Sequence, residues 1–92
     1  MKLLKIGAIW CGGCLIMNNT IEKIKKNYSI DYQELDIDMD EEESKKYNPG
    51  EKLPVFIVLD NDKEITRFVG EYSYDEFKNK LIEVGVIDEE NN

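Results

Sequence analysis

Hydrophobic residues recur along the chain with two different periods, which predict an alternation of strands and helices. An apolar run over residues 2–10 ends at a pair of glycines, as a buried strand leading into a turn does. From residue 14 onward the apolar positions recur every three or four residues with charged residues between them, so a helix is expected over residues 12–27. The buried face of this helix is predicted to consist of Cys14, Met17, Ile21, Ile24 and Tyr28.

The following segment continues the alternation with a strand and a short helix. Residues 30–38 mix Ile, Tyr and Leu with polar positions and are expected to form a second strand. Residues 40–47 place Glu41 four positions before Lys45, the favourable order for an ion pair on a helix, and Asn48-Pro49-Gly50 then ends this helix. The acidic run is interpreted as a solvated face, because adjacent glutamates point in different directions on a helix.

Two strands and a helix complete the pattern. The most apolar run covers residues 53–59 and is predicted to be a strand buried on both faces, with Pro54 at its start, where a missing N–H is tolerated. Turn-forming residues lead into a returning antiparallel strand over residues 65–69. Ser73 and Glu76 then form a capping box at the start of the last helix. The resulting order is β-α-β-α-β-β-α.

Length and composition are those of one small globular domain. The chain has 92 residues, of which 41% are hydrophobic and 35% charged, so we expect a single domain over residues 1–88 and an acidic flexible tail over residues 89–92. Twenty acidic against twelve basic residues give a net charge of -8, which disfavours nucleic-acid and membrane binding. No apolar stretch is long enough to span a membrane and no signal-peptide cleavage site follows residues 1–10, so we expect a cytoplasmic protein.

Cys11 and Cys14 carry the clearest chemical signal in the sequence. They are the only cysteines, they stand where the first strand passes into the first helix, and the chain has no histidine to serve as a base or a metal ligand. A helix N-terminus favours a thiolate, so Cys11 is predicted to be the exposed nucleophile. Two intervening residues let the second sulfur reach the first, and Cys14 on the buried helix face is therefore the candidate resolving thiol.

Three competing roles for this pair remain open on the residues alone. A zinc site needs four ligands, which two thiols supply only with a second chain or with carboxylates. Two inert buried cysteines would leave Gly12 and Gly13 unexplained, because glycine destabilises a helix unless its backbone must approach another group closely. A structural disulfide is disfavoured in the cytoplasm. Reversible dithiol–disulfide exchange, with no metal, is the interpretation that we prefer.

The sequence Trp10-Cys11-Gly12-Gly13-Cys14 resembles the W-C-G-P-C site of the thioredoxin superfamily. Leu53-Pro54 stands where that family has a cis-proline loop opposite the disulfide, and the resemblance extends over residues 2–87. It implies a minimal thioredoxin-like α/β fold, β-α-β-α-β-β-α, with a four-stranded mixed sheet and helices on both faces. It also implies a substrate-binding groove in which the backbone of Leu53 pairs with an extended substrate. That groove is formed by Trp10, Gly12, Gly13, Leu53 and Pro54.

The function that the resemblance implies is that of a thioredoxin-like protein-disulfide reductase, which transfers electrons and maintains redox homeostasis. No bound cofactor is expected, because the redox centre is the Cys11–Cys14 disulfide itself. Its partners would be disulfide-containing proteins as substrates, with a flavoprotein disulfide reductase or glutathione as electron donor, and we expect a monomer. The alternatives are a glutathione-linked glutaredoxin-type enzyme and a noncatalytic binding or metal module that uses the same site.

The chain also departs from the patterns of both related families. Glutaredoxins usually have Pro-Tyr between the cysteines and Thr before the cis-proline, whereas this chain has Gly-Gly and Leu53, and Lys52 is the only adjacent cation for glutathione. Thioredoxins have a buried acid six residues before the first cysteine, where this chain has Lys5. Lys5 is expected either to attract the thiolate electrostatically or to extend out of the end of its strand.

Overall fold

The computed structural model describes residues 1–88, and its elements follow the predicted order. The predicted tail over residues 89–92 lies outside the described residues. The elements are β1 (Lys2–Gly7), α1 (Gly12–Asn27), β2 (Asp31–Asp36), α2 (Glu41–Lys45), β3 (Val55–Asp60), β4 (Lys63–Val69) and α3 (Tyr74–Val84).

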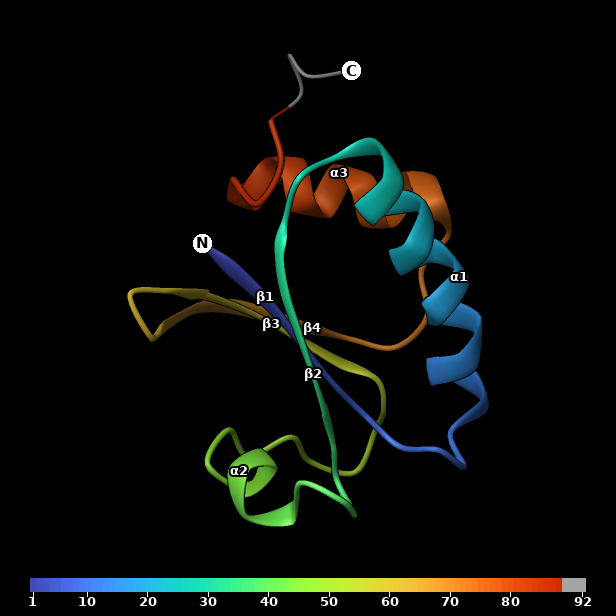
Figure 1. Cartoon of the computed structure of the whole chain (residues 1–92), viewed down its shortest axis with the longest axis vertical. Helices are drawn as coiled ribbons and strands as arrows, with labels where there is room; N and C mark the ends of the chain where they lie inside the picture. The colour runs from blue at the N-terminus through green and yellow to red at the C-terminus, as the bar shows by residue number, and fades with distance from the viewer. Residues whose placement is uncertain (89–92) are drawn as a thin grey trace.

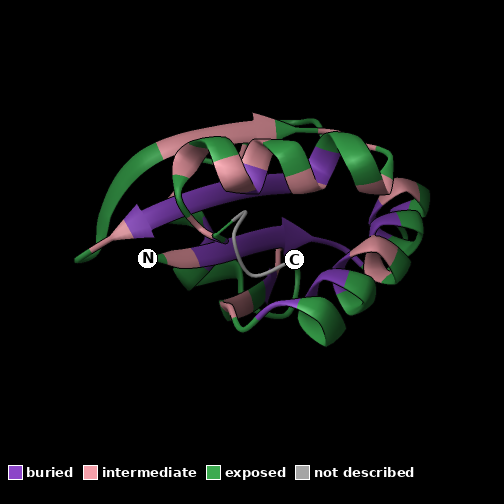
Figure 2. Ribbon diagram, turned by 90° about the horizontal axis from the view of Figure 1, so that it is seen from above, coloured by how far each residue is buried: buried purple, intermediate pink, exposed green. Residues whose placement is uncertain are grey.

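The four strands form one mixed sheet, as predicted, and their order in the sheet is β2-β1-β3-β4. β1 runs parallel to β2 and antiparallel to β3, and β4 pairs antiparallel with β3. The helices α1 and α3 lie on one side of the sheet and α2 lies on the other (Figure 1). The two central strands, β1 and β3, are buried along nearly their whole length, because both of their faces are covered (Figure 2).

Each face of the sheet has its own hydrophobic cluster, and successive residues of β1 contribute to opposite faces. Leu3 packs with Phe56 and Phe77 in the cluster beneath α1 and α3. Leu4 and Ile6 belong to the cluster on the side of α2. This alternation follows from the two-residue period of a strand and leaves the odd-numbered positions facing α1.

The ends of the last helix match the sequence signals. The Ser73 Oγ accepts a hydrogen bond from the Glu76 N–H at 3.2 Å, and Glu76 Oε1 accepts one from the Ser73 N–H at 3.0 Å, which completes the predicted capping box. Gly85 follows α3 with φ of 89°, the left-handed conformation in which glycine commonly ends a helix. The buried residues of α3 are Phe77 and Leu81.

Four predicted strand boundaries are wrong by two or three residues. β2 ends at Asp36, two residues earlier than expected, and β3 begins at Val55, two residues later than expected. β1 ends at Gly7, three residues earlier than expected, because the chain turns before α1 and the Cys11 N–H donates to the Ala8 carbonyl at 3.2 Å. β4 begins at Lys63, two residues earlier than expected. Asn61 and Asp62 have φ of 52° and 65° there and form a tight two-residue hairpin turn between the strands.

Among the described helices, none is long and apolar enough to cross a membrane.

Candidate active site

The two cysteines are free thiols at the start of α1. Cys11 is the N-cap residue: its backbone is extended, and its Sγ accepts a hydrogen bond from the Cys14 N–H at 3.1 Å. An N-cap side chain normally uses an oxygen to satisfy one of the unpaired N–H groups at a helix start. Here a sulfur takes that position, so the helix itself holds the two cysteines side by side.

Both thiols are largely buried, which corrects the prediction of an exposed Cys11. Cys11 retains 8% of its surface and Cys14 retains 3%. The two residues form a small apolar cluster with Ala8, against which the partly buried Leu53 packs. Neighbours contributed by other parts of the chain therefore cover Cys11, which its position at the helix start does not reveal. The predicted shielding of Cys14 agrees with its burial.

Burial also disfavours the charged form of the second thiol. The pKa of Cys14 is raised to about 11, mainly by desolvation and secondly by a hydrogen bond with Cys11. A backbone contact of Ala8 and the positive charge of Lys5 act in the opposite direction. Cys14 is therefore a protonated thiol at neutral pH, which must lose its proton before it can act as a nucleophile.

Gly7 at the end of β1 makes room for the second sulfur. A Cβ atom built on Gly7 would lie 2.8 Å from the Cys14 Sγ, closer than a side chain can approach, and 3.4 Å from the Cys14 Cβ. Of the two glycines between the cysteines, only Gly13 has a close neighbour, since its Cβ would lie 3.1 Å from the Cγ of the exposed Glu71. A Cβ on Gly12 would meet no atom within 4 Å, so close approach does not explain that glycine.

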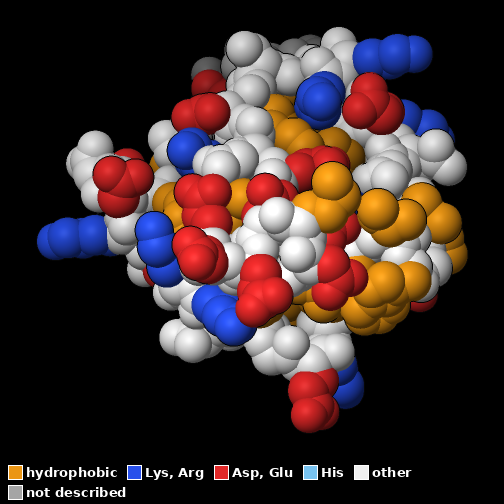
Figure 3. Space-filling view, turned by 60° about the horizontal axis from the view of Figure 1, so that its bottom comes forward, with side chains coloured by type: hydrophobic (Ala, Val, Ile, Leu, Met, Phe, Trp, Pro, Cys, Tyr) orange, Lys and Arg blue, Asp and Glu red, His pale blue; other side chains and the backbone are white. Residues whose placement is uncertain are grey.

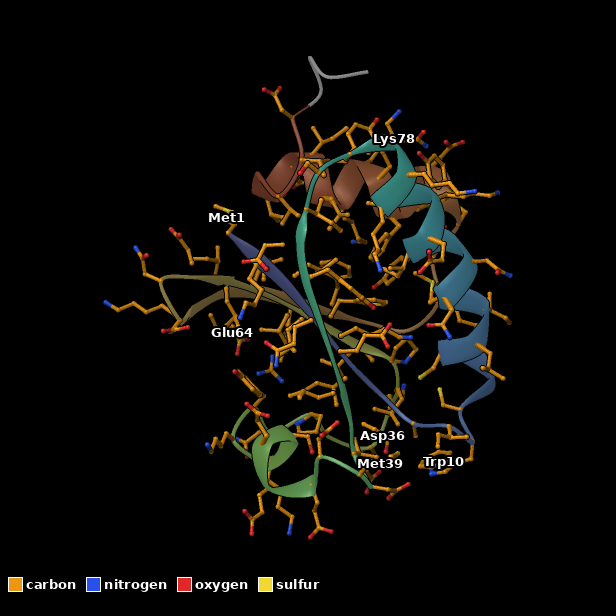
Figure 4. The ribbon with its side chains drawn as sticks, viewed as in Figure 1. Met1, Trp10, Asp36, Met39, Glu64 and Lys78 are labelled. Carbon is orange, nitrogen blue, oxygen red and sulfur yellow. The ribbon has the colours of Figure 1, made fainter. Side chains whose placement is uncertain are left out.

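Trp10 is exposed beside the pair, with 66% of its surface accessible. Its Nε1 donates a hydrogen bond to Asp38 Oδ2 at 2.8 Å, which fixes the indole against the loop that follows β2. Asp36 shapes that loop by accepting hydrogen bonds from the N–H groups of Met39 and Asp38, and these bonds lower the pKa of the Asp36 carboxyl. Figure 4 shows Trp10, Asp36 and Met39 close together where β1 and β2 end.

Leu53 and Pro54 approach the pair from the segment before β3. Leu53 is half-buried and packs against the cluster of Ala8 and the cysteines, and Pro54 is buried. The peptide bond between Leu53 and Pro54 is cis. The structure thus brings together residues that are far apart in the sequence, with Trp10 and Leu53 both adjacent to the thiols.

Lys5 does not extend out of its strand. It is 4% exposed, and its Nζ donates hydrogen bonds to the Cys14 carbonyl at 3.2 Å and to Asn18 Oδ1 at 2.5 Å. Its Nζ also lies 3.9 Å from Glu34 Oε1. Lys5 contributes to the wall of a surface pocket of about 330 Å³ behind the second thiol. That pocket is lined by Lys5, Gly7, Ala8, Ile9, Cys14, Leu15, Asn18, Glu34, Leu35, Asp36 and Asp40.

Within residues 1–88 no group of three or more His, Cys, Asp or Glu side chains is placed to hold a metal ion.

Three further residues of the site were not identified from the sequence: Gly7, Asn18 and Asp38. Gly7 had a usable signal, because it is a glycine within the predicted first strand, shortly before the cysteine pair. The pairing of Asp38 with Trp10 had none, because it joins residues 28 positions apart.

Comparisons with known proteins agree with this geometry. A family model described as Thioredoxin matches residues 1–83. Thioredoxin-1 of Saccharomyces cerevisiae is 33% identical over 64 residues, which make up 68% of this chain and 61% of the yeast protein. The chain thus spans less than two thirds of the length of that curated relative.

Solved structures of the same kind superpose on most of the chain. The structure of thioredoxin 1 from the thermophilic eubacterium Thermosipho africanus is 27% identical, with a TM-score of 0.75, and the match covers 92% of this chain and 98% of the other. A thioredoxin from Nicotiana alata is 26% identical with a TM-score of 0.79, and the match covers 89% of this chain and 70% of the other.

Proposed function

The chain belongs to the thioredoxin family, and on that basis we propose that it reduces disulfide bonds in other proteins through Cys11 and Cys14. The observation that carries this proposal is the contact between the two residues. They are the only cysteines of the chain, and the first accepts a hydrogen bond from the backbone of the second at the start of one helix. This arrangement suits two thiols that must form and break a bond with each other.

The proposed reaction transfers two electrons to the substrate. The Cys11 thiolate attacks one sulfur of a substrate disulfide, so a mixed disulfide forms and the other substrate sulfur leaves as a thiolate that takes a proton from water. Cys14, once deprotonated, attacks the Cys11 sulfur of the mixed disulfide. The bond to the substrate breaks, the substrate leaves with two thiols, and the protein is left with a Cys11–Cys14 disulfide.

The surface around the cysteine pair suits an extended segment of a protein substrate. Five large hydrophobic side chains there are each more than half exposed, and we call them the apolar rim: Ile9, Trp10, Leu15, Ile16 and Met39. Figure 3 shows hydrophobic side chains gathered on one side of this face, with acidic side chains beside them. Exposed apolar patches of this kind mark sites of protein binding. We propose that the apolar rim, together with Leu53 and Pro54, holds the substrate over Cys11.

The oxidised protein must be returned to the dithiol by a donor. We propose a flavoprotein disulfide reductase or glutathione for this role, in the cytoplasm, where protein thiols are kept reduced, and with the protein acting as a monomer. Turnover with each donor alone distinguishes the two. The only cation adjacent to Leu53 in the sequence is the exposed Lys52, so we expect the flavoprotein to be the better donor.

The decisive experiment is equilibration of the protein in thiol/disulfide buffers of defined potential, followed by alkylation and mass analysis. We expect a reversible two-electron transition at about -270 mV, as for other thioredoxins, and a transition above about -180 mV would indicate an oxidant or isomerase instead. The Cys14→Ser variant should accumulate a mixed disulfide at Cys11, and the Cys11→Ser variant should not. If no internal disulfide forms at any potential, the site is a binding or metal module and the proposal is wrong.

The role of the apolar rim is tested by Trp10→Ala. This variant should lower kcat/KM for a protein disulfide by about tenfold, because it removes a large contact surface, and should leave the reduction of a small aromatic disulfide within twofold. Ile65→Ala is the matched control, since Ile65 is also exposed but lies on β4 in the hairpin away from the site. An equal effect of the two substitutions on the protein substrate would contradict the role of the rim.

A further inference from the structure

A buried cation stands directly behind the second thiol. The ammonium of Lys5 has three oxygen neighbours: the Cys14 carbonyl, Asn18 Oδ1 and Glu34 Oε1. An ammonium has three donors and no acceptor, so this set fits the charged form of the side chain. The contact with the Cys14 carbonyl places the charge against the same residue whose sulfur must become a thiolate.

The side chain of Lys5 and the sulfur of Cys14 both lie next to Gly7 of β1. Lys5 and Gly7 alternate with Ile6 along the strand and so face the same side of the sheet. The empty Cβ position of Gly7 is 2.8 Å from the Cys14 Sγ and 3.7 Å from the Lys5 Cε. The lysine side chain and the thiol are therefore separated by little more than the space that this glycine leaves open.

The charge of Lys5 is only partly balanced by its neighbours. Burying a cation is costly unless an anion lies close to it. Among residues 1–88 the one ion pair of Lys5 is with Glu34 at 3.9 Å, and the side chain of that glutamate is 54% exposed and thus screened by water. A negative charge formed on Cys14 would be a second anion near the ammonium, on its buried side.

We propose that Lys5 is a positioning residue for the second step of the reaction, in which its ammonium stabilises the thiolate of Cys14 during the attack on the Cys11 sulfur. The inference rests on the proposed function, because only disulfide exchange requires a thiolate at Cys14. Lys5 itself takes no proton in this step. The Cys14 proton leaves to water, the Cys14–Cys11 bond forms, and the bond from Cys11 to the substrate sulfur breaks. The substrate sulfur leaves with the electron pair of that bond as a thiolate, which takes a proton from water.

The pocket behind Cys14 gives that proton a way out. Cys14 and Lys5 line it together, and exposed residues form its outer wall, so it connects the second thiol with the surface. Other ionisable groups face this region from every neighbouring element. They are Cys11 at the start of α1, Tyr32, Glu34 and Asp36 of β2, Asp40 before α2, and Glu71 before α3.

The electrostatic balance at Cys14 agrees with this role. Burial and the neighbouring Cys11 hold the pKa of Cys14 high, and the positive charge of Lys5 lowers it. Within the group of residues that face the pocket, Lys5 is the cation, and its charge favours the thiolate.

The test uses a protein in which Cys14 is the only thiol. In the Cys11→Ser background, the thiolate is followed by its ultraviolet absorbance and by its rate of alkylation as the pH is raised. We expect Lys5→Met to slow alkylation at a fixed pH below the titration midpoint by about tenfold, the effect of one unit in pKa. Lys2→Met removes a charge from the same strand away from the sulfur, and should change the rate less than threefold.

Three further variants keep the proposal falsifiable if Lys5→Met fails to fold. Asn18→Asp places a carboxylate against the Lys5 ammonium and should also slow alkylation, whereas Asn19→Asp adds the same charge at an exposed position of α1 and should not. Lys5→Arg keeps the charge and should stay within threefold of the parent. Equal rates for Asn18→Asp and Asn19→Asp, or an equal loss for Lys5→Arg and Lys5→Met, would overturn the role of the charge.

These measurements need no substrate and no electron donor. If Lys5→Met shifts the Cys14 titration in the Cys11→Ser background but the parent protein forms no internal disulfide, the proposed function is wrong and the effect of Lys5 on the thiolate stands. A protein that forms the disulfide normally but shows no difference between Lys5→Met and Lys2→Met would retain its proposed function, and the inference about Lys5 would be wrong.

Discussion

At the scale of single residues, the second thiol depends on a glycine outside the cysteine motif. The absent side chain of Gly7 leaves the space that the Cys14 sulfur occupies. Gly7→Ala should destabilise the protein by about 1–3 kcal/mol, because the added methyl group must displace the sulfur or the strand. Denaturant unfolding of the reduced protein measures this free energy.

The control for that substitution lies in the motif itself. Gly12→Ala adds the same methyl group where no atom lies within 4 Å, and should leave the stability unchanged or raise it by less than about 1 kcal/mol. The two substitutions should therefore have clearly different effects although both are glycine to alanine near Cys14. A loss of equal size in both would mean that the space beside the sulfur is not what Gly7 provides.

The buried thiol also gives stability a dependence on pH. The pKa of Cys14 is raised to about 11 in the folded protein, chiefly by burial, whereas an unfolded thiol titrates near pH 8.5. Between these values the unfolded chain has lost a proton that the folded protein retains, so stability must fall as the pH rises. Below about pH 8.5 both forms are protonated and this effect is absent.

Thermal unfolding of the reduced protein between about pH 8 and pH 10 tests this dependence. The midpoint should fall more for the parent than for Cys14→Ala, which lacks the group. Burial and a hydrogen bond to Glu34 also raise the pKa of Tyr32, but that contribution is present in both proteins and cancels in the comparison. Parallel decreases in the two proteins would show that Cys14 does not titrate as stated.

The residues of the site also show how far the sequence alone can be interpreted. The period of α1 places Cys14 on the buried face with Met17 and Ile21, and all three are buried. The burial of Cys11 was not predicted, because part of it comes from Ile37 and Leu53, which lie 26 and 42 positions away in the sequence and pack against its cluster only in the folded chain. Local hydrophobic patterns predict which face of a helix or strand a residue occupies, but they do not predict which distant residues pack against it.

At the scale of the elements, α3 depends on its capping box. Ser73→Ala removes the hydroxyl that accepts a hydrogen bond from the Glu76 N–H, and should lower the free energy of unfolding by about 1 kcal/mol. Equilibrium denaturation measures the loss. Ser29→Ala is the control at an exposed serine after α1, and it should have no measurable effect. A smaller loss for Ser73→Ala than for Ser29→Ala would contradict the role of the cap.

The bounds of an element were predicted well where its hydrophobic period is long, and poorly where apolar residues continue beyond the end of the element. Sixteen residues of α1 match the expected helix at both ends, since its period persists over more than four turns and a glycine pair marks its start. The strand before it was predicted too long, because Ile9 and Trp10 are apolar and extend the run, yet both are exposed in the turn. Their hydrophobic character belongs to the surface of the site and not to the core.

At the scale of the whole molecule, the net charge of -8 predicts a negative electrostatic potential at the proposed substrate-binding surface. Asp36 at the end of β2, and Asp38 and Asp40 in the loop that follows, lie beside the apolar rim. Of two peptides with the same disulfide, one flanked by lysines should be reduced about tenfold faster at low salt than one flanked by glutamates, because opposite charges accelerate encounter.

Salt provides the control for this comparison. The screening length falls from about 10 Å at 0.1 M to about 3 Å at 1 M, so the difference between the two peptides should nearly vanish at the higher concentration. Stopped-flow measurements of Trp10 fluorescence give the rates. A preference that persists at 1 M salt would mean that specific contacts, and not the overall charge, select the substrate.

The hydrogen bond between the Cys14 N–H and the Cys11 sulfur makes the backbone a built-in reporter of the site. A thiolate accepts such a bond more strongly than a thiol does, and a sulfur engaged in a disulfide has lost that charge. In a nitrogen–proton correlation spectrum the Cys14 amide resonance should therefore occupy a different position in each redox and protonation state. The state of the pair becomes visible without a dye, a label or a coupled assay, at the one amide that the nucleophilic sulfur caps.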